Sequence, residues 1–217
     1  MGVLGGTGPA GSGLAARLAA NGNEVILGSR SVERAEEVCE GIKQRWPDRT
    51  LTLSAGDNLK ATSADIVVVA TPWDSAAAVV SELCEQLEGK VIVSMANALA
   101  KVGDEFQPLI SPRGSVAGSV QSRLPNSYVA AAFQHLAARA LATLDVELEA
   151  DVLVCSDHPQ ATAATIEMAN TVPGLRGLDA GPLGNAGSLE SMVAILREVN
   201  VRYKGSRSSV RLTGVKA

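Results

Sequence analysis

Short runs of β-branched and aliphatic residues alternate along most of the chain with longer segments in which apolar residues recur at helical spacing. The apolar runs predict strands and the periodic segments predict helices, because side chains alternate between two faces along a strand but return to one face after each turn of a helix. Regular alternation of the two is typical of repeated βαβ units that build a parallel sheet. We therefore expect an α/β fold, with a Rossmann-type doubly wound parallel sheet and a smaller C-terminal α/β lobe.

The clearest elements lie in the first two thirds of the chain, where strands are expected at 2–4, 24–28, 50–54, 66–70, 91–94 and 128–133. Helices are expected from the glycine-rich segment after the first strand to about residue 21, and at 32–44, 74–87 and 114–124. The last third predicts strands near 152–155 and 175–178, with helices near 159–170 and 188–203. Residues 96–112 show no regular pattern. The run at 66–70 is apolar throughout, which predicts a central strand that is covered on both faces.

The chain of 217 residues is long enough for one full core with an appended lobe. We place the boundary near residue 134, where no Pro/Ser-rich linker marks it. The expected organisation is a main domain at 1–134 and a smaller C-terminal lobe at 135–217.

Composition and charge argue against several classes of function, namely binding of nucleic acid, membrane insertion and metal binding. The chain is 46% apolar and 19% charged, as in ordinary globular proteins. Its net charge of −4 argues against nucleic-acid binding, and the basic residues between 202 and 211 are expected to form a solvated tail. No apolar run is long enough for a membrane span and no leader segment is visible, so we expect a cytoplasmic protein without membrane contact. Three widely spaced cysteines, Cys39, Cys84 and Cys155, predict inert thiols and no metal site.

The segment Gly6-Thr7-Gly8-Pro9-Ala10-Gly11 has the GxGxxG pattern and stands between an expected strand and an expected helix. In this setting Gly6 allows the tight turn, Gly8 lets a pyrophosphate approach the backbone, and Gly11 lets helix and strand pack closely. The amide groups at the helix start then bind the phosphates, and Pro9 suits the first helical turn because its missing N–H would have no partner there. A glycine-rich turn without a ligand is the structural alternative.

The end of the second expected strand indicates which dinucleotide binds. NAD-binding proteins usually have Asp or Glu there for the ribose hydroxyls, whereas this chain has Ser29 and Arg30. A serine hydroxyl and a guanidinium can both donate to the 2′-phosphate of NADP, and Arg34 falls on the same side as Arg30. NADP is therefore favoured over NAD, with a merely solvated Arg30 as the alternative.

Acid and base candidates for alcohol or ketone chemistry are scarce. His135 and His158 are the only histidines, and His158 stands at an expected helix start where a surface role is favoured. No Tyr is followed four positions later by Lys. Direct hydride transfer between two stacked cofactors needs positioning and exclusion of water but no acid or base in the central step. The sequence therefore favours transfer between redox cofactors, without a catalytic side chain.

The chain resembles the NADPH-dependent reductases of the deazaflavin coenzyme F420, also called F420:NADP oxidoreductases, over nearly its whole length. The resemblance is carried by these motifs: the glycine loop with Ser29-Arg30, Thr71-Pro72-Trp73, Val93-Ser94-Met95-Ala96-Asn97, Leu153-Val154-Cys155-Ser156-Asp157, Leu178-Asp179-Ala180-Gly181-Pro182-Leu183 and Asn200-Val201-Arg202-Tyr203-Lys204. The last two are the most specific.

The resemblance implies that residues 1–134 bind NADP and that residues 135–217 complete a cleft in which the deazaflavin stacks on the nicotinamide. The residues matching those that hold the dinucleotide are Thr7, Gly8, Pro9, Ala10, Ser29, Arg30 and Arg34, with Thr71, Pro72, Ser75 and Asn97 nearer the nicotinamide. The segment 132–138, with His135 and Ala138, resembles the deazaflavin-facing strand end, and Leu183 to Asn185 resemble a wall of the same cavity. Family members commonly have His where this chain has Gln134, so a structural role for His135 is an alternative. A homodimer is also implied.

Two alternatives keep the nucleotide site and change the function. The first is a redox-sensing protein that binds NADP without turnover, which the scarcity of acid–base residues favours. The second is an NADPH-dependent enzyme whose acceptor is a flavin or ferric iron.

Overall fold

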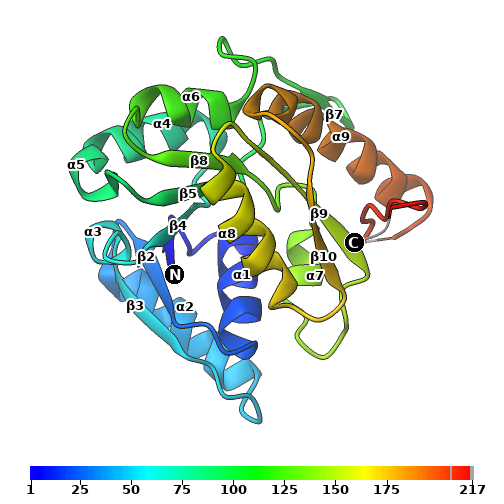
Figure 1. Cartoon of the computed structure of the whole chain (residues 1–217). Helices are drawn as coiled ribbons and strands as arrows, with labels where there is room; N and C mark the ends of the chain where they lie inside the picture. Colours follow the sequence, from blue (N-terminus) through cyan, green and yellow to red (C-terminus); the bar gives the residue numbers. More distant parts are fainter. Residues whose placement is uncertain (206, 216–217) are drawn as a thin grey trace.

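The computed structural model describes residues 1–205 and 207–215 and has a mostly parallel eight-stranded sheet with helices on both faces (Figure 1). In sheet order the strands are β10 (Leu175–Asp179), β9 (Ala150–Ser156), β8 (Tyr128–Ala131), β5 (Val91–Ser94), β4 (Ile66–Val69), β1 (Gly2–Leu4), β2 (Val25–Ser29) and β3 (Leu53–Asp57). The order reverses at β1, which lies between β2 and β4. Such a reversal is the point at which doubly wound sheets bind ligands, beyond the carboxyl ends of the strands.

The helices form two layers, one on each face of the sheet. One layer contains α1 (Pro9–Ala20), α2 (Val32–Arg45), α7 (Ala138–Leu141) and α8 (Pro159–Asn170). The other contains α3 (Asn58–Ala61), α4 (Trp73–Glu82), α5 (Cys84–Leu87), α6 (Val116–Arg123), a 3₁₀ turn at Leu183–Asn185 and α9 (Ala186–Arg202). The predicted α/β fold class is confirmed.

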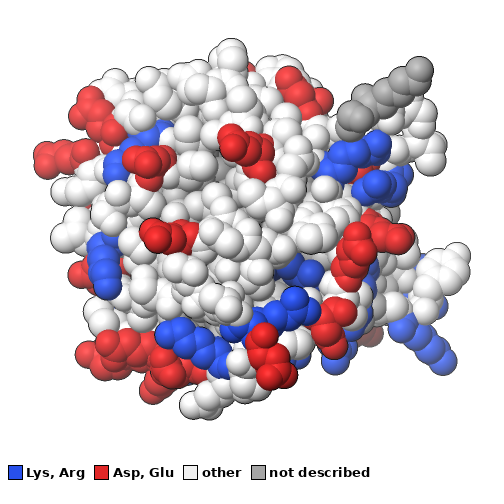
Figure 2. All heavy atoms as spheres, turned by 60° about the horizontal axis from the view of Figure 1, so that its bottom comes forward, with Lys and Arg blue, Asp and Glu red and all other residues white. Residues whose placement is uncertain are grey.

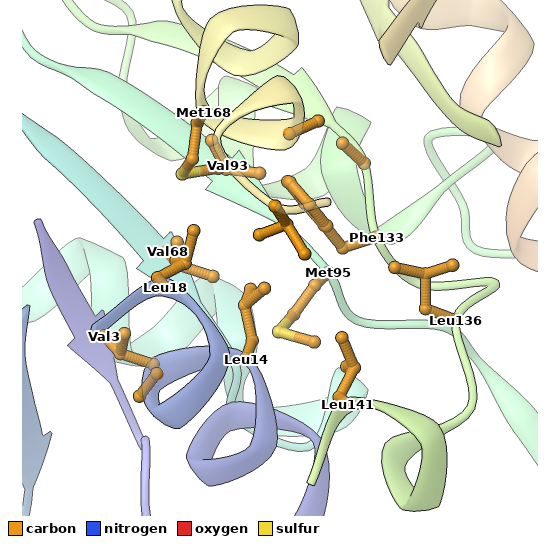
Figure 3. Close-up of a cluster of buried hydrophobic side chains, with 14 of the residues drawn as sticks. Val3, Leu14, Leu18, Val68, Val93, Met95, Phe133, Leu136, Leu141 and Met168 are labelled. Carbon is orange, nitrogen blue, oxygen red and sulfur yellow. The ribbon is translucent and has the colours of Figure 1, made fainter. Parts of the chain in front are cut away.

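Two buried apolar clusters hold the layers together, because successive strand residues point to opposite faces. Val68 and Val93 belong to the cluster under α1 and α8, which Figure 3 shows. Val69 and Ile92, their chain neighbours, belong to the cluster under α4 and α6. Central strands buried on both faces read as continuous apolar runs, as the sequence at 66–70 predicts.

The sheet continues across the predicted boundary at residue 134. Strand β8 lies before that residue and β9 after it, and they pair antiparallel, with Ala130 opposite Ser156. Strands β9 and β10 are parallel to each other and run against the rest of the sheet. The start of β9 therefore lies beyond the end of β8. This is the same end of the sheet as the glycine loop, where the parallel strands have their carboxyl ends. The division into 1–134 and 135–217 stays a prediction.

Three predicted elements differ from those in the structure. The third strand runs over Leu53–Asp57 instead of 50–54, because its register with β2 extends through Gly56, a residue that breaks the apolar alternation. The expected helix at 74–87 is interrupted at Leu83, which separates α4 from α5. The segment 96–112 contains a hairpin of β6 (Leu99–Val102) and β7 (Glu105–Pro108). Its turn includes Gly103 with φ +61°, a conformation that glycine adopts readily.

The basic residues of the predicted solvated tail are exposed, as expected, but the segment after α9 also contacts β9. Arg211 Nη1 lies 3.2 Å from the carbonyl oxygen of Gly174 and 3.5 Å from a carboxylate oxygen of Asp151. The backbone N–H of Leu212 donates to the same carboxylate at 2.7 Å. The Asp151 side chain is fully buried, and a buried carboxylate requires partners of this kind. Hydrogen bonds from Arg176 hold the pKa of Asp151 below its usual value.

Charge on the face drawn in Figure 2 is mixed, with Lys and Arg interspersed among Asp and Glu. Within residues 1–205 and 207–215 no helix combines the length and the apolar composition that a membrane crossing requires. In the same ranges no three His, Cys, Asp or Glu side chains gather closely enough to hold a metal ion. Cys39 and Cys155 are buried and Cys84 is exposed.

Candidate functional site

The glycine loop joins β1 to α1 at the reversal point of the sheet, and its glycines have different environments. A Cβ on Gly11 would lie 2.8 Å from the Cβ of Ala70, and one on Gly6 would lie 2.9 Å from Leu27. These two positions have room only for hydrogen. A Cβ on Gly8 would have no heavy atom nearer than the Gly5 carbonyl oxygen at 4.0 Å. The backbone of Gly8 therefore faces open space that a ligand can approach.

Helix α1 begins directly after Gly8, with Pro9 in its first turn. No side chain of the described residues caps this helix start. The amide groups of a first helical turn have no partner within the helix, and together with the helix dipole they favour an anion. The loop and the helix start, which include Thr7 and Ala10, thus form an anion-binding corner at the carboxyl end of β1.

Ser29 and Arg30 follow at the end of β2, next to this corner. Ser29 is mostly buried, and its Oγ accepts the backbone N–H of Ser31 at 3.3 Å. Arg30 is exposed and forms no ion pair with a described residue. Arg34 instead lies in the first turn of α2, where it pairs with Glu37 at 2.9 Å. The guanidinium of Arg30 is therefore the freer of the two for a phosphate.

The ends of β4 and β5 bring further predicted residues to the same edge. The Oγ1 of Thr71 is buried without a hydrogen-bond partner among the residues described, and so is Ser94 Oγ. Ser75 Oγ donates to the carbonyl oxygen of Pro72 at 3.0 Å, at the start of α4. Asn97 Nδ2 lies 3.4 Å from the carbonyl oxygen of Gln134, which joins the segment after β5 to the one after β8.

The chain turns sharply after β8. Phe133 is fully buried and has φ +67°, a left-handed backbone conformation that is strained for a bulky residue. The expected strand at 128–133 therefore ends at Ala131. This turn sends residues 134–137 along the sheet edge. Figure 3 shows Met95 beside Leu14 and Leu141, with Phe133 and Leu136 on the side away from α1.

His135 is buried and anchored through one ring nitrogen, whereas its Nδ1 has no hydrogen-bond partner among the described residues. Its side chain is 2% exposed, and Nε2 lies 2.8 Å from the backbone oxygen of Asp151. Burial lowers the pKa of His135, which favours the neutral ring. Gln134 is also buried, and neither atom of its side-chain amide has a partner in the described part of the chain. Gln134 thus has unused hydrogen-bonding capacity at this position, whereas one nitrogen of His135 is already engaged.

A cavity of about 260 Å³ opens at this edge. The predicted residues that line it are Ala10, Asn97, Gln134, His135 and Ala138. The predicted deazaflavin-facing segment 132–138 also contributes Phe133, Leu136 and Ala137. The sequence analysis assigned no site role to the remaining lining residues, which are Met95, Arg139, Val193, Leu196, Arg197, Asn200 and Ser208. Several of these come from α9, which reaches the cavity from the far end of the chain. Only the motif around Asn200 could have indicated that this helix contributes.

Leu183 does not line this first cavity. It is buried and lines a second cavity of about 610 Å³ with Gly184, Asp157 and residues of α6. Its backbone N–H donates to Asp157 at 3.0 Å, directly after β9, whose last residue Ser156 lies opposite Ala130 of β8. The structure therefore separates Leu183 from Asn97, His135 and Ala138, which line the first cavity.

Comparison with known proteins agrees with this geometry. A family model described as "NADP oxidoreductase coenzyme F420-dependent" matches residues 1–98. The F420-dependent NADP reductase of Methanocaldococcus jannaschii is 35% identical over 98% of this chain and 97% of its own length. The reductase of that name from Methanothermobacter thermautotrophicus is 30% identical over 98% of this chain and 94% of its own.

Solved structures support the fold. The crystal structure of an Arthrobacter protein superimposes with a TM-score of 0.81 at 21% identity, covering 98% of each chain. The sequence identity to the two archaeal reductases extends through both the glycine-loop half and the C-terminal half. The chain therefore belongs to the family of F420-dependent NADP reductases.

Proposed function

We propose that this protein transfers a hydride between NADP(H) and the deazaflavin coenzyme F420, as the names of its relatives suggest. The observation that carries the proposal is the set of segments that line the first cavity, the one of about 260 Å³. It begins at Ala10 on the glycine loop, passes the end of β5 at Asn97 and reaches the turn after β8 at Gln134. A dinucleotide bound at the loop would direct its reactive ring into this cavity.

The residues present fit a phosphorylated dinucleotide. Gly6 and Gly11 allow the close packing of loop and helix, and Gly8 leaves space for a pyrophosphate to contact the backbone. The uncapped start of α1 offers amide donors to that pyrophosphate. Arg30 and Ser29 lie where a 2′-phosphate would follow, and an unpaired guanidinium there favours NADP over NAD.

The residues also fit two stacked planar rings. Thr71 Oγ1, Ser94 Oγ and the Gln134 amide are buried without partners among the described residues. Such groups are rare in folded proteins, because each costs free energy until a partner supplies the hydrogen bond. A bound nicotinamide or deazaflavin, whose rim carries carbonyl and N–H groups, would supply it. Ala137 and Leu196 line the cavity, are partly exposed and offer apolar surface for the ring faces.

When both cofactors are bound, the reduced nicotinamide supplies a hydride, and the deazaflavin takes up that hydride with one proton from water. The protein's part is to position the rings and to keep water from between them. Neutral, buried His135 needs to move no proton in this scheme. Thr71, Ser75 and Asn97 are proposed to orient the nicotinamide, and Ala138 to border the deazaflavin.

The test is to mix the purified protein with NADPH and F420 and to follow the deazaflavin absorbance. We expect the oxidised deazaflavin band to disappear, with NADPH active and NADH much less so. Flavin and ferric complexes serve as competing acceptors. Faster reduction of either would support the second alternative, and tight NADP binding without reduction of any acceptor would support the redox-sensing protein.

We further propose that the protein forms a homodimer, as the family resemblance implies. Ile195, Val199 and Tyr203 are 64%, 38% and 80% exposed and follow one side of α9 and its C-terminal end. Exposed apolar side chains at such spacing are typical of a surface that a partner covers. Sedimentation of the wild type and of Ile195→Glu tests this proposal. A monomeric wild type at micromolar concentration would contradict it.

A further inference from the structure

We propose that Arg139 and Arg197 form an anion subsite at the rim of the first cavity, which binds a phosphate or carboxylate group on the side chain of the hydride acceptor. This inference rests on the proposed function, because that function places the acceptor in this cavity. The inference goes beyond that function because it says which chemical groups the acceptor carries outside its ring system.

The charges that line the cavity are of one sign. Among the residues that the structure describes, Arg139 and Arg197 are the only lining residues with a permanent charge, and no Asp or Glu lines the cavity. The chain as a whole has 23 acidic residues against 19 Lys and Arg. An excess of positive charge at this one cavity therefore runs against the charge of the whole protein, and it favours an anionic ligand.

Neither guanidinium is neutralised within the part of the chain that the structure describes. Both side chains are exposed, and neither forms an ion pair with a described residue. Arg202 on the same helix as Arg197 behaves differently, because its Nε lies 2.6 Å from a carboxylate oxygen of Glu198. The two arginines at the cavity thus keep their donors available.

The guanidinium of Arg197 and the helix that carries Arg139 are both held in place. The guanidinium carbon of Arg197 lies 4.1 Å from the ring centre of Phe106, a cation–π contact between α9 and β7. Arg139 belongs to α7, whose carbonyl oxygens at Ala140 and Leu141 accept hydrogen bonds from buried Arg17. The cation–π contact reduces the entropy that the Arg197 side chain loses when it binds an anion.

The dinucleotide's 2′-phosphate is too distant to be the ligand, and its pyrophosphate is proposed to be bound by backbone amides of the glycine loop and the start of α1. The 2′-phosphate is proposed to lie at Arg30 after β2, whereas Arg139 follows β8. The sheet places β5, β4 and β1 between β8 and β2. Four strand spacings of 4.7–4.9 Å separate the two strands by about 19 Å. A second anion is needed, and the remaining partner in the reaction is the acceptor.

The test compares F420, whose side chain carries phosphate and carboxylate groups, with its uncharged deazariboflavin core. Binding of each is measured at equilibrium by deazaflavin fluorescence anisotropy with NADP⁺ present. The variants are Arg139→Met, Arg197→Met and the double variant, with Arg202→Met as the matched control on α9. Arg197→Gln serves as a second variant if Arg197→Met lowers the melting temperature.

We expect the double variant to weaken F420 binding about tenfold, because two exposed charge pairs with the anionic side chain are lost. Binding of the uncharged core and of NADP⁺ should stay unchanged in every variant. Added salt should weaken F420 binding in the wild type and much less in the double variant. Arg202→Met should match the wild type.

Equal wild-type affinity for the two deazaflavins at low salt would overturn the subsite, and so would equal loss of both in the double variant. The proposed function is judged separately, by whether the wild type reduces the uncharged core with NADPH. A protein that reduces both acceptors but binds them equally well keeps the function and loses the subsite. A protein that binds F420 through these arginines but reduces neither acceptor keeps the subsite and loses the function.

Discussion

Arg17 on α1 and Ala140 on α7 are joined by a hydrogen bond of 2.8 Å from the guanidinium Nη2 to the backbone oxygen. The same guanidinium donates to the carbonyl oxygens of Leu141 at 3.2 Å and Val146 at 2.9 Å. The side chain is 4% exposed and has no carboxylate partner among the described residues. One helix thus starts at the glycine loop and also holds the segment that lines the cavity.

Arg17→Met should therefore loosen the segment 138–146. We expect the free energy of unfolding to fall by about 3 kcal/mol, because several buried carbonyl groups lose their donor. Urea unfolding measures this loss, and Arg17→Lys, which keeps the charge but not the planar fork, should recover only part of it. A Met variant within about 0.5 kcal/mol of the wild type would show that these hydrogen bonds contribute little.

Three glycine substitutions separate packing from ligand contact. Gly11→Ala should destabilise the fold by at least about 1 kcal/mol, because its Cβ would lie 2.8 Å from Ala70. Gly8→Ala should leave stability nearly unchanged but weaken NADP⁺ binding, since its Cβ would fill the space proposed for the pyrophosphate. Gly41→Ala in α2 meets nothing within 4 Å and should stabilise the helix by about 0.5–1 kcal/mol without affecting binding. Unaltered NADP⁺ binding by Gly8→Ala would place the pyrophosphate elsewhere.

A variant at Arg30 tests why the protein should prefer NADP⁺ to NAD⁺. Removing its guanidinium in Arg30→Ala should weaken NADP⁺ by about 1.5–3 kcal/mol, the value of a hydrogen bond to a charged group, and should barely change NAD⁺. Arg45→Ala is the matched control, because Arg45 lies at the opposite end of α2 from Arg30. Titration calorimetry gives both affinities. Equal losses for the two dinucleotides would mean that Arg30 does not contact the 2′-phosphate.

Glu190 gives stability a specific pH dependence. Its carboxylate accepts the backbone N–H groups of Val116 and Ala117 at the start of α6. Burial nevertheless raises the pKa of Glu190 from 4.5 to about 6. A carboxyl group with a higher pKa in the folded protein binds more protons when folded, so its contribution to stability is greatest below pH 4.5 and decreases as the pH rises to about 6.

The wild type should therefore lose about 2 kcal/mol more stability than Glu190→Gln when the pH is raised from about 4 to 7. Urea unfolding of both proteins at the two pH values measures the difference. The glutamine keeps an acceptor for one of the two amides but does not titrate. Parallel pH profiles for the two proteins would show that Glu190 titrates at its ordinary pKa.

The sequence predicted the parts of the fold that depend on local patterns. The apolar run at 66–70 and the glycine loop each indicate their structure within a few residues, and both lie where expected. The hairpin after β5 had a local signal as well, since Gly103-Asp104 is a typical two-residue hairpin turn. It was missed because its strands carry few β-branched residues, and tertiary contacts such as Phe106 with Arg197 add to the pairing of the two strands.

The missed parts of the site depend on contacts between distant segments. Nothing near Phe133 indicates a left-handed backbone, because the surrounding core imposes it on a residue that disfavours it. Arg197 on α9 lines the cavity, and the segment after α9 contacts the buried Asp151 of β9, both through contacts between residues far apart in the sequence. The position of Leu183 likewise follows from the antiparallel β9, a reversal that no residue pattern signals.

The central claim is that the two rings meet in the cavity at the ends of β5 and β8 and exchange a hydride directly. The most direct measurement uses NADPH labelled with deuterium at the transferred position, reacted with F420 in ordinary water. We expect the isolated reduced deazaflavin to carry the deuterium, and Gly8→Ala to slow its appearance. Reduced deazaflavin with hydrogen from the solvent in place of the label, or no reduction at all, would contradict the account.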